Sequence, residues 1–495
     1  MDFVGDLPII GHNIDFDLDF LATKGVDIPN LRFDTLQLST IMFPELPSHS
    51  LEIITESLNI THKDKHRALD DAKATAELFN ILINKISEID FETLEKIKSV
   101  AMRSKWPLKE IIVSTKSKKT QEKAIDTKES SKDTVSLSFD KKDILSFYDE
   151  NGPLSKIEEN YEIRDPQITM TKKIIDAMDG SYHLLCEAGT GTGKTIAYLL
   201  PAIFKAKADN QKIIIATHTK HLQDQLQSKD IPILQKAINI YLDKKTQNKP
   251  FSSTVLKGRK NYLSKKRLEL FMQKSFFQDH EVTMIIKILL WLQTTKTGDR
   301  EELTLQRKEY FAWNEVCCDA IKCPHKDEKY SKNCFLARAR QKAQNADIII
   351  TNHALLISDT VTSSPVLPEY KYLILDEAHH LESEATKALT LDLTADLLSH
   401  PLNNIKKLNK NHPEHAEQIE SLMSKIEVLF GILGIFYEKN IEYANNINNL
   451  SIQEHMKDTI EWKRLVESAE NLYIKGKKMI KSIKETIPGE SSLLI

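Results

Sequence analysis

The sequence predicts an α/β fold with a parallel, doubly wound sheet. Three short apolar segments carry this prediction, and each ends in polar residues: KIIIATHT at 212–219, DIIITN at 347–352 and YLILDEAHH at 372–380. A fourth segment, YHLLCEA at 182–188, leads into a glycine-rich loop, after which TIAYLLPAIFKA has the pattern of a helix. Short apolar strands that alternate with helices are typical of parallel sheets.

Composition places few limits on function. The chain has 495 residues, of which 41% are hydrophobic and 28% charged, as in a globular protein of several domains. A net charge of −3 gives no global sign of nucleic-acid binding, although a local basic groove would not alter that total. The sequence starts without a signal peptide, and its apolar runs are too short to span a membrane. We therefore expect a cytoplasmic protein without membrane contact.

Four regions follow one another along the chain. Residues 1–88 are mixed in character and end in an amphipathic helix, and residues 89–150 form a helical bridge followed by a polar, Lys- and Ser-rich linker. Residues 151–384 contain the alternating strands and helices. Residues 385–495 are rich in Leu, Lys, Asn and Glu and contain few glycines, which predicts long helices.

The segment AGTGTGKT has the spacing and context of a phosphate-binding loop, because it follows an apolar strand and opens a helix. Its glycines let backbone N–H groups surround phosphate oxygens, and the helix N-terminus favours negative charge. Lys194 is expected to reach the β- and γ-phosphates of ATP, and the Thr195 hydroxyl to bind Mg²⁺. The alternative is a glycine-rich turn without a ligand. The predicted residues are Ala188, Gly189, Thr190, Gly191, Thr192, Gly193, Lys194 and Thr195.

The segment LILDEAHH supplies the second half of an ATP site. Asp376 ends an apolar strand, where its carboxylate can hold Mg²⁺, and Glu377 can activate the attacking water. The alternative, a solvated acidic turn, is weakened by the phosphate loop upstream. We also predict that His379 contributes to nucleotide binding and that the amide of Gln167, in YEIRDPQITM, pairs with an adenine edge.

These motifs together resemble those of the DinG/XPD-like superfamily 2 helicases. The matching segments are AGTGTGKT, DEAH, THTKHLQDQL, LKGRKNYL and ADIIITNHALL, which together extend the resemblance from about residue 160 to the end of the chain. The resemblance implies a RecA-like domain and translocation on single-stranded nucleic acid, with DNA favoured over RNA. It also implies that Thr217, Thr219 and Gln223 contact the nucleic-acid backbone, which would make binding salt-dependent.

Two segments near the start resemble the second and third motifs of DnaQ-like 3'-5' exonucleases, which have a ribonuclease-H-like fold. They are HNIDFD at 12–17 and HRALDDA at 66–72. The resemblance implies that Asp17 and Asp71 bind two Mg²⁺ ions, or Mn²⁺, and that His66 is the general base. The alternative places Asp71 on a helix surface and His66 in a loop. An exonuclease region ahead of a helicase region resembles the arrangement of the DinG-type family of low-GC Gram-positive bacteria.

The sequence departs from both patterns. No Asp-x-Glu pair precedes Asp17, and no Gln-x-x-Gly-Arg-x-x-Arg motif is present. We therefore expect an incomplete exonuclease domain at 1–88, one RecA-like domain at 151–384 without a second, and a chain shortened at both ends. Residues 385–495 are then a helical, arch-like insertion. Exonuclease and unwinding activity should be impaired, and the alternative is an ATP- and DNA-binding module without turnover of its own.

The cysteines form the last departure. XPD-like relatives hold a [4Fe–4S] cluster through four cysteines, but Ser264 occupies the position expected for the first. The remaining cysteines, in an insertion at about 258–345, are Cys317, Cys318, Cys323 and Cys334. We therefore expect reduced thiols rather than a cluster, with a zinc site that includes His325 as a lesser alternative.

Overall fold

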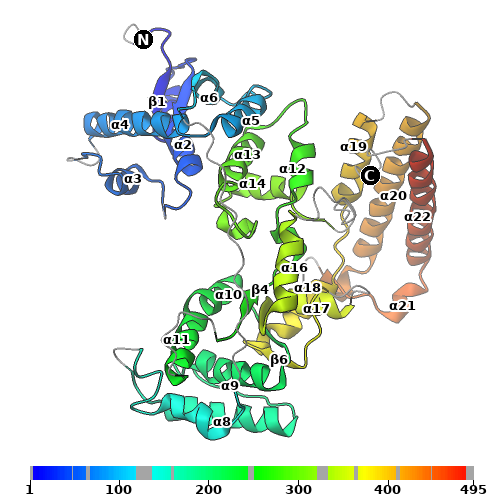
Figure 1. The fold of residues 1–495 in the computed structure, drawn as a ribbon. Coiled ribbons are helices and arrows are strands. Elements are labelled where there is room, and N and C mark those ends of the chain that lie inside the picture. Colours follow the sequence, from blue (N-terminus) through cyan, green and yellow to red (C-terminus); the bar gives the residue numbers. More distant parts are fainter. Residues whose placement is uncertain are drawn as a thin grey trace. The chain divides into compact units, whose positions relative to one another are not determined.

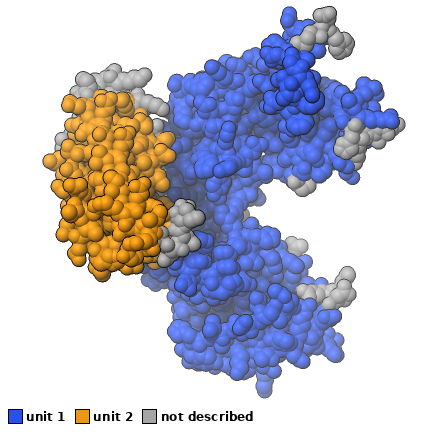
Figure 2. Space-filling view, turned by 180° about the vertical axis from the view of Figure 1, so that it is seen from behind, with its two compact units in different colours: residues 1–388 blue, residues 389–495 orange. Residues whose placement is uncertain are grey.

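The computed structural model describes most of the chain and divides it into two compact units, residues 1–388 and 389–495 (Figure 2). Each unit is described by itself. The described residues are 4–46, 48–62, 67–118, 137–157, 161–242, 250–319, 333–361, 366–408, 413–446 and 449–486.

The N-terminal region is a small α/β layer. Strand β1 pairs in parallel with β2, so that Ile10 lies beside Phe33, and the helix α1 connects the two strands. The predicted amphipathic helix is α4, whose buried face includes Leu78, Leu82 and Ile86. The elements are β1 (Ile9–Gly11), α1 (Ile14–Thr23), β2 (Arg32–Asp34), α2 (Thr35–Met42), α3 (Leu51–Ser57) and α4 (Ala68–Ser87).

The N-terminal region shares one hydrophobic core with the bridge and with the Cys-containing segment, and these three parts lie side by side (Figure 1). Trp106 of the bridge and Trp313 of the Cys-containing segment are both fully buried in it. The backbone N–H of Phe277 donates to the carbonyl of Arg103 at 2.8 Å. A segment predicted as an insertion in the RecA-like domain therefore packs on the N-terminal side. Its helices, with those of the bridge, are α5 (Phe91–Ala101), α6 (Lys109–Ser114), α12 (Lys265–Phe271), α13 (Asp279–Trp291) and α14 (Arg307–Ala312).

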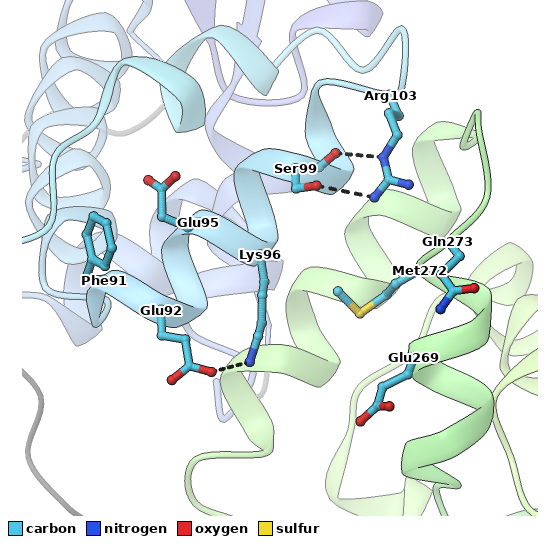
Figure 3. A pocket seen from close by; sticks show the side chains of 9 residues that line it. All are labelled: Phe91, Glu92, Glu95, Lys96, Ser99, Arg103, Glu269, Met272 and Gln273. Carbon is cyan, nitrogen blue, oxygen red and sulfur yellow. Dashed lines mark hydrogen bonds and ion pairs between the residues drawn. The ribbon is translucent and has the colours of Figure 1, made fainter.

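A pocket of about 570 Å³ lies between α5 and α12 (Figure 3). Its walls combine an exposed ring, Phe91, with acidic and basic side chains. Two of these are already paired, since Lys96 lies 2.6 Å from Glu92. None of the predicted site residues lines this pocket.

The second core of unit 1 surrounds a four-stranded parallel sheet in the order β4-β5-β3-β6. Alternate residues of β3 face opposite sides: Ile213 and Ile215 join one hydrophobic cluster, whereas Ile214 and Ala216 join another. Both faces are therefore covered, which explains why the strand is apolar throughout and confirms the predicted parallel sheet. The strands are β3 (Ile213–Thr217), β4 (Ser253–Val255), β5 (Ile348–Asn352) and β6 (Tyr372–Leu375).

Helices cover both faces of this sheet. The predicted helix after the glycine-rich loop is α9, which is almost entirely buried along its length. α10 continues through one π-helical turn at 226–230 into α11. The helices are α7 (Lys141–Leu145), α8 (Asp165–Gly180), α9 (Lys194–Asp209), α10 (Lys220–Gln225), α11 (Ile231–Tyr241), α16 (Phe335–Asn345), α17 (His353–Val361) and α18 (Leu381–Leu389).

The segment YHLLCEA is not a strand, so this part of the sequence prediction was wrong. β6 is an edge strand of the described sheet, and residues 182–188 pair with no strand among the described residues. Leu185 is 94% exposed. A strand needs a neighbour for its backbone N–H and C=O groups, and apolar character alone does not supply one.

Unit 2 consists mainly of three helices, as the composition of residues 385–495 predicted. α20 packs against both α19 and α22, and their apolar faces form a separate core that includes Ile419, Ile426 and Ile483. A short antiparallel pair, β7 with β8, and a small helix complete the unit. The elements are α19 (Ala395–Leu408), α20 (Pro413–Lys439), β7 (Ala444–Asn446), β8 (Asn449–Leu450), α21 (Glu454–Lys457) and α22 (Ile460–Thr486).

Among the described residues, every helix is too short or too polar to cross a membrane. Short 3₁₀ turns connect several elements of both units. They are Ser146–Tyr148, Arg259–Asn261, Arg300–Glu302, Trp313–Glu315, Ala378–His380 and Ile441–Tyr443.

Candidate functional site

The glycine-rich loop has the backbone that a phosphate-binding loop requires. Gly191 and Gly193 both have φ of 78°, in the left-handed region, and α9 begins directly after them. A Cβ atom on Gly193 would lie 2.3 Å from the amide nitrogen of Gln167. Glycine is therefore required at 193 for two reasons, backbone conformation and space.

Gln167 and Arg164 hold this loop from the helix α8. Gln167 is buried, and its Nε2 donates to the carbonyl of Gly193 at 3.0 Å. The guanidinium of Arg164 donates to the carbonyl of Gly191 at 3.1 Å. Sequence reasoning missed Arg164, although it stands in the same YEIRDPQITM segment. Contact with adenine remains a prediction for Gln167.

The parallel strands bring the two halves of the predicted ATP site together. Lys194 Nζ lies 3.4 Å from Glu377 Oε1, across 183 positions of sequence. The Thr217 hydroxyl donates to Asp376 Oδ2 at 3.5 Å. β3 and β6 are neighbouring parallel strands, so their carboxyl ends lie at the same end of the sheet.

The carboxylates at this edge lie in a partly desolvated environment. Burial, followed by the charge of Glu377, raises the pKa of Asp376, and Lys194 opposes the shift. Burial, followed by the charges of Asp376 and Asp230, raises the pKa of Tyr198 well above its ordinary value, so this phenol stays neutral. Crowded carboxylates next to hydroxyls are hard oxygen donors, which fit Mg²⁺. Sequence reasoning missed Tyr198, which lies one helical turn after Thr195.

Glu377 itself has an unusual backbone. Its φ and ψ are 52° and 45°, in the left-handed region, although it is not a glycine. Such a conformation is strained for a residue with a side chain and persists only where the surroundings enforce it. His379, predicted as a nucleotide-site residue, has its Nδ1 at 3.4 Å from Glu377 Oε2.

Three further histidines surround this edge of the sheet, and sequence reasoning missed them. His353 is fully buried, and its Nε2 donates to the carbonyls of Ala216 at 3.2 Å and Asp376 at 3.0 Å. Burial lowers the pKa of His353, and the two carbonyl acceptors require a proton on Nε2. The rings of His218 and His380 are stacked. The signal in the sequence was a histidine within five residues of the carboxyl end of β3, β5 and β6.

The predicted nucleic-acid residues differ in accessibility. Thr217 and Gln223 are fully buried, and the amide of Gln223 has no hydrogen-bond partner within the described part of the chain. Thr219 is exposed and caps α10, because its hydroxyl accepts from the backbone N–H of Leu222 at 3.3 Å. Of the three, only Thr219 presents its side chain to solvent.

An ion network around one buried lysine ties α10 to the Cys-containing segment. Lys257 is almost fully buried and pairs with Asp299 at 2.6 Å and with Glu301. Glu301 also pairs with Lys220 of α10 at 2.6 Å. Burial opposes the charge on Lys257, but hydrogen bonds to the two carboxylates raise its pKa overall. The motifs THTKHLQDQL and LKGRKNYL therefore meet in space through these side chains.

The candidate nuclease residues do not come together as the residues of the candidate ATP site do. Asp17 lies exposed in the first turn of α1. Asp71, in the first turn of α4, accepts from His62 Nε2 at 2.7 Å. His66 lies outside the described residues. Within the described ranges, no group of three or more His, Cys, Asp or Glu side chains could hold a metal ion. Sequence reasoning missed His62, although it stands four residues before His66.

The cysteine segment places its thiols in different surroundings. Cys317 and Cys318 are buried, and burial raises the pKa of Cys317 against the opposing charge of Arg267. Ser264 is the N-cap of α12. It lies beside the two cysteines, because the preceding residue, Leu263, forms an antiparallel β-bridge with Cys317. Cys334 precedes α16. Cys323 and His325 lie outside the described residues, so the predictions about a cluster and a zinc site remain predictions.

Comparisons with known proteins match three parts of the chain to families. Residues 2–79 match an exonuclease family (RNase_T), residues 167–270 match the DEAD/DEAH box helicases, and residues 305–398 match the DEAD_2 family. The first match contains Asp17 and Asp71, and the second contains the glycine-rich loop.

Similar proteins cover most of the chain. It is 30% identical over 444 residues to the 3'-5' exonuclease DinG of Bacillus subtilis, which is 85% of this chain and 45% of that protein. It is 28% identical over 455 residues to the 3'-5' exonuclease DinG of Staphylococcus aureus strain USA300, covering 87% and 48%. The chain spans about half the length of these relatives. With an exonuclease-family region ahead of a DEAD/DEAH helicase region, the chain is similar to DinG-type proteins over most of its own length.

Proposed function

We propose that this chain binds and hydrolyses ATP at the edge of the parallel sheet and acts on single-stranded nucleic acid, with DNA favoured over RNA. The observation that carries the proposal is the convergence of Lys194 with Glu377 and of Thr217 with Asp376. The helicase-family match over this region supports it.

In this proposal the loop N–H groups and the dipole of α9 hold the phosphates. Lys194 moves from Glu377 to the β- and γ-phosphates, since a phosphate offers more negative charge than one carboxylate. The movement frees the Glu377 carboxylate to orient a water molecule and accept its proton. Thr195 and Asp376 would hold Mg²⁺, which neutralises phosphate charge when bound. Gln167 keeps the loop in place.

ATP hydrolysis with and without oligo(dT) tests the proposal. Lys194→Ala should weaken ATP binding about 10- to 100-fold, because this factor corresponds to the free energy of one hydrogen bond to a charged group. Glu377→Gln should lower kcat about 10²- to 10⁴-fold and leave ATP binding unchanged. Lys207→Ala is the matched control on the same helix, since Lys207 pairs with Asp347 at 3.5 Å, away from the loop. Equal turnover in all four proteins would refute the proposal.

A second activity, 3'-5' exonuclease, is favoured by the family match at 2–79. We propose Asp17 and Asp71 as ligands of Mg²⁺ or Mn²⁺ and His66 as the general base. The test is shortening of a 5'-labelled oligonucleotide by the chain beside its Asp17→Ala/Asp71→Ala variant. Asp19→Ala, an exposed acid on the same helix α1, is the control. Shortening that survives the double substitution would place the nuclease chemistry elsewhere.

The alternative to turnover is a module that binds ATP and single strands without chemistry. ATP binding that depends on Lys194, with no hydrolysis in the presence of oligo(dT), would favour this alternative. The same measurement thus separates the two readings.

A further inference from the structure

The proposed hydrolysis leaves one buried hydroxyl beside the candidate ATP site without a role. Tyr198 lies on α9, is 4% exposed and packs in the hydrophobic core on one face of the parallel sheet. Its hydroxyl has no hydrogen-bond partner within the part of the chain that the structure describes. Burial of such a group costs free energy, so an orphaned hydroxyl points to a functional role or to a bound ion or water.

The polar groups around this hydroxyl include both candidate Mg²⁺ ligands. Thr195 stands three positions before Tyr198, on the same face of α9. The carboxylates of Asp376 and Asp230 also act on the phenol. Burial, and then these two charges, raise the pKa of Tyr198 well above its ordinary value. The phenol therefore keeps its proton and remains a hydrogen-bond donor beside two acids.

Asp230 comes from an irregular part of the fold. Residues 226–230 form a π-helical turn between α10 and α11, and this turn packs against α9. Asp230 is the last residue of the turn and is 8% exposed. Turns of this kind are rare and occur frequently at functional sites. Here the turn brings a second buried acid toward Tyr198, which favours the protonated phenol.

The strands alone hold Asp376 weakly. The Thr217 hydroxyl donates to Asp376 Oδ2 at 3.5 Å, which is long for a hydrogen bond. Carboxylates that bind metal ions are themselves held by hydrogen bonds from neighbouring groups, and these partners contribute about 10- to 100-fold to metal affinity. A neutral phenol on α9 offers such a donor without adding a charge.

We propose that Tyr198 is a positioning residue of the candidate Mg²⁺ site: its hydroxyl donates to the Asp376 carboxylate and fixes the orientation in which this carboxylate holds the ion. The inference rests on the proposed function, in which Thr195 and Asp376 bind Mg²⁺, and adds a third residue to that site. The ring of Tyr198 serves the core, whereas its hydroxyl serves the site. Tyr198→Phe separates the two roles, because it removes the hydroxyl and keeps the ring.

Nucleotide binding at different Mg²⁺ concentrations tests the proposal. A fluorescent ATP analogue is titrated in EDTA and at increasing Mg²⁺ concentrations, with the unaltered chain and with Tyr198→Phe. The Mg²⁺ concentration that gives half of the gain in nucleotide affinity should rise about 10-fold or more in the variant. Binding in EDTA should be unchanged. The Tm of the ligand-free variant should be equal or higher, because the hydroxyl that it lacks had no partner.

The matched control is Tyr148→Phe. Tyr148 is buried in the same core, but its hydroxyl is hydrogen-bonded to that of Thr171 at 2.9 Å. Tyr148→Phe should therefore lower the Tm and leave the Mg²⁺ dependence of nucleotide binding unchanged. The reverse pattern in the two variants would assign the tyrosines the opposite roles and overturn the inference.

The remaining outcomes separate this inference from the proposed function. If Tyr198→Phe needs no more Mg²⁺ than the unaltered chain, or binds nucleotide equally weakly in EDTA and in Mg²⁺, the inference is overturned while ATP binding stands. If the unaltered chain binds nucleotide but gains nothing from Mg²⁺, the inference falls together with the proposed Mg²⁺ ligands. If it binds no nucleotide at all, the inference and the proposed function are both overturned.

Discussion

The candidate nucleotide site and the candidate nuclease site were predicted from motifs of similar length, but the structure brings the predicted residues together only at the first. At the candidate nucleotide site, residues from α9, β3 and the turn after β6 come within hydrogen-bond distance. In the N-terminal region, Asp17 is exposed and Asp71 is paired with His62. The difference follows from how each site is assembled.

A phosphate loop is local, because one segment of eight residues supplies the glycines, the lysine and the helix N-terminus. Its partner acid needs only a neighbouring parallel strand, and β3 and β6 supply that register. A two-metal nuclease site needs several carboxylates from separate segments, so every segment must be positioned by tertiary contacts. A motif therefore specifies the first kind of site much more completely than the second.

The largest expected effect lies on the N-terminal side. Lys287 and Glu309 are both almost fully buried and lie 2.8 Å apart, in the core shared by the N-terminal region and the Cys-containing segment. Lys287→Met leaves Glu309 buried without its cation and should lower the free energy of unfolding by about 3–5 kcal/mol. Urea denaturation followed by tryptophan fluorescence measures this.

A matched control is Lys274→Met, because Lys274 pairs with Glu281 at 2.9 Å on the surface. It should cost less than about 1 kcal/mol. If both variants lose equal stability, the buried pair does not hold this region together. If Lys287→Met unfolds the N-terminal region but leaves ATP binding intact, the two sites belong to separately stable parts.

The next effect lies at the nucleotide site. Gly193→Ala forces a Cβ onto Gln167 and into a left-handed backbone, which should cost about 1–2 kcal/mol and weaken ATP binding. Thermal unfolding and nucleotide titration measure both effects. Gly189→Ala is the control for the unfolding measurement alone, since a Cβ there has nothing within 4 Å. Unchanged ATP binding in Gly193→Ala would mean that the loop tolerates the displacement of Gln167.

A smaller effect is expected in the ion network of Lys220, Lys257 and Glu301, which joins α10 to the Cys-containing segment. Burial opposes ionisation of Glu301, but hydrogen bonds from Lys220 and Lys257 lower its pKa overall. The ionised form therefore stabilises the fold at neutral pH, and this contribution is lost as pH falls through the lowered pKa. Glu301→Gln should cost about 1 kcal/mol or less at pH 7, because the group is partly exposed and screened.

Urea denaturation of the unaltered chain and of the Glu301→Gln variant at several pH values measures how the contribution of Glu301 to stability changes with pH. The difference in stability between the two proteins should be largest at neutral pH and should shrink in acid. A difference that grows as the pH falls would contradict the assigned charges.

The smallest effect is expected at Leu185, in the segment wrongly predicted as a strand. Leu185→Ser should change the free energy of unfolding by less than about 0.5 kcal/mol, because the side chain is 94% exposed. Leu199→Ala, at a fully buried position of α9, should cost about 2–5 kcal/mol. A large loss in Leu185→Ser would show that residues 182–188 pack against a surface after all.

The apolar pattern of the sequence determined the parallel strands β3, β5 and β6, the helix α9 and the long helices of unit 2. The sequence also specified the glycine-rich loop, because its glycines, its lysine and the start of the helix follow one another directly along the chain. These features depend on local periodicity and on backbone preferences, which a single segment carries.

Only the tertiary structure decided the rest. It packed the Cys-containing segment on the N-terminal region, left residues 182–188 unpaired among the described strands, and stacked His218 on His380. Each of these depends on which surfaces meet across long stretches of chain, and no local pattern encodes the partner. The sequence therefore supplied candidate side chains for chemistry, and the packing decided which of them meet.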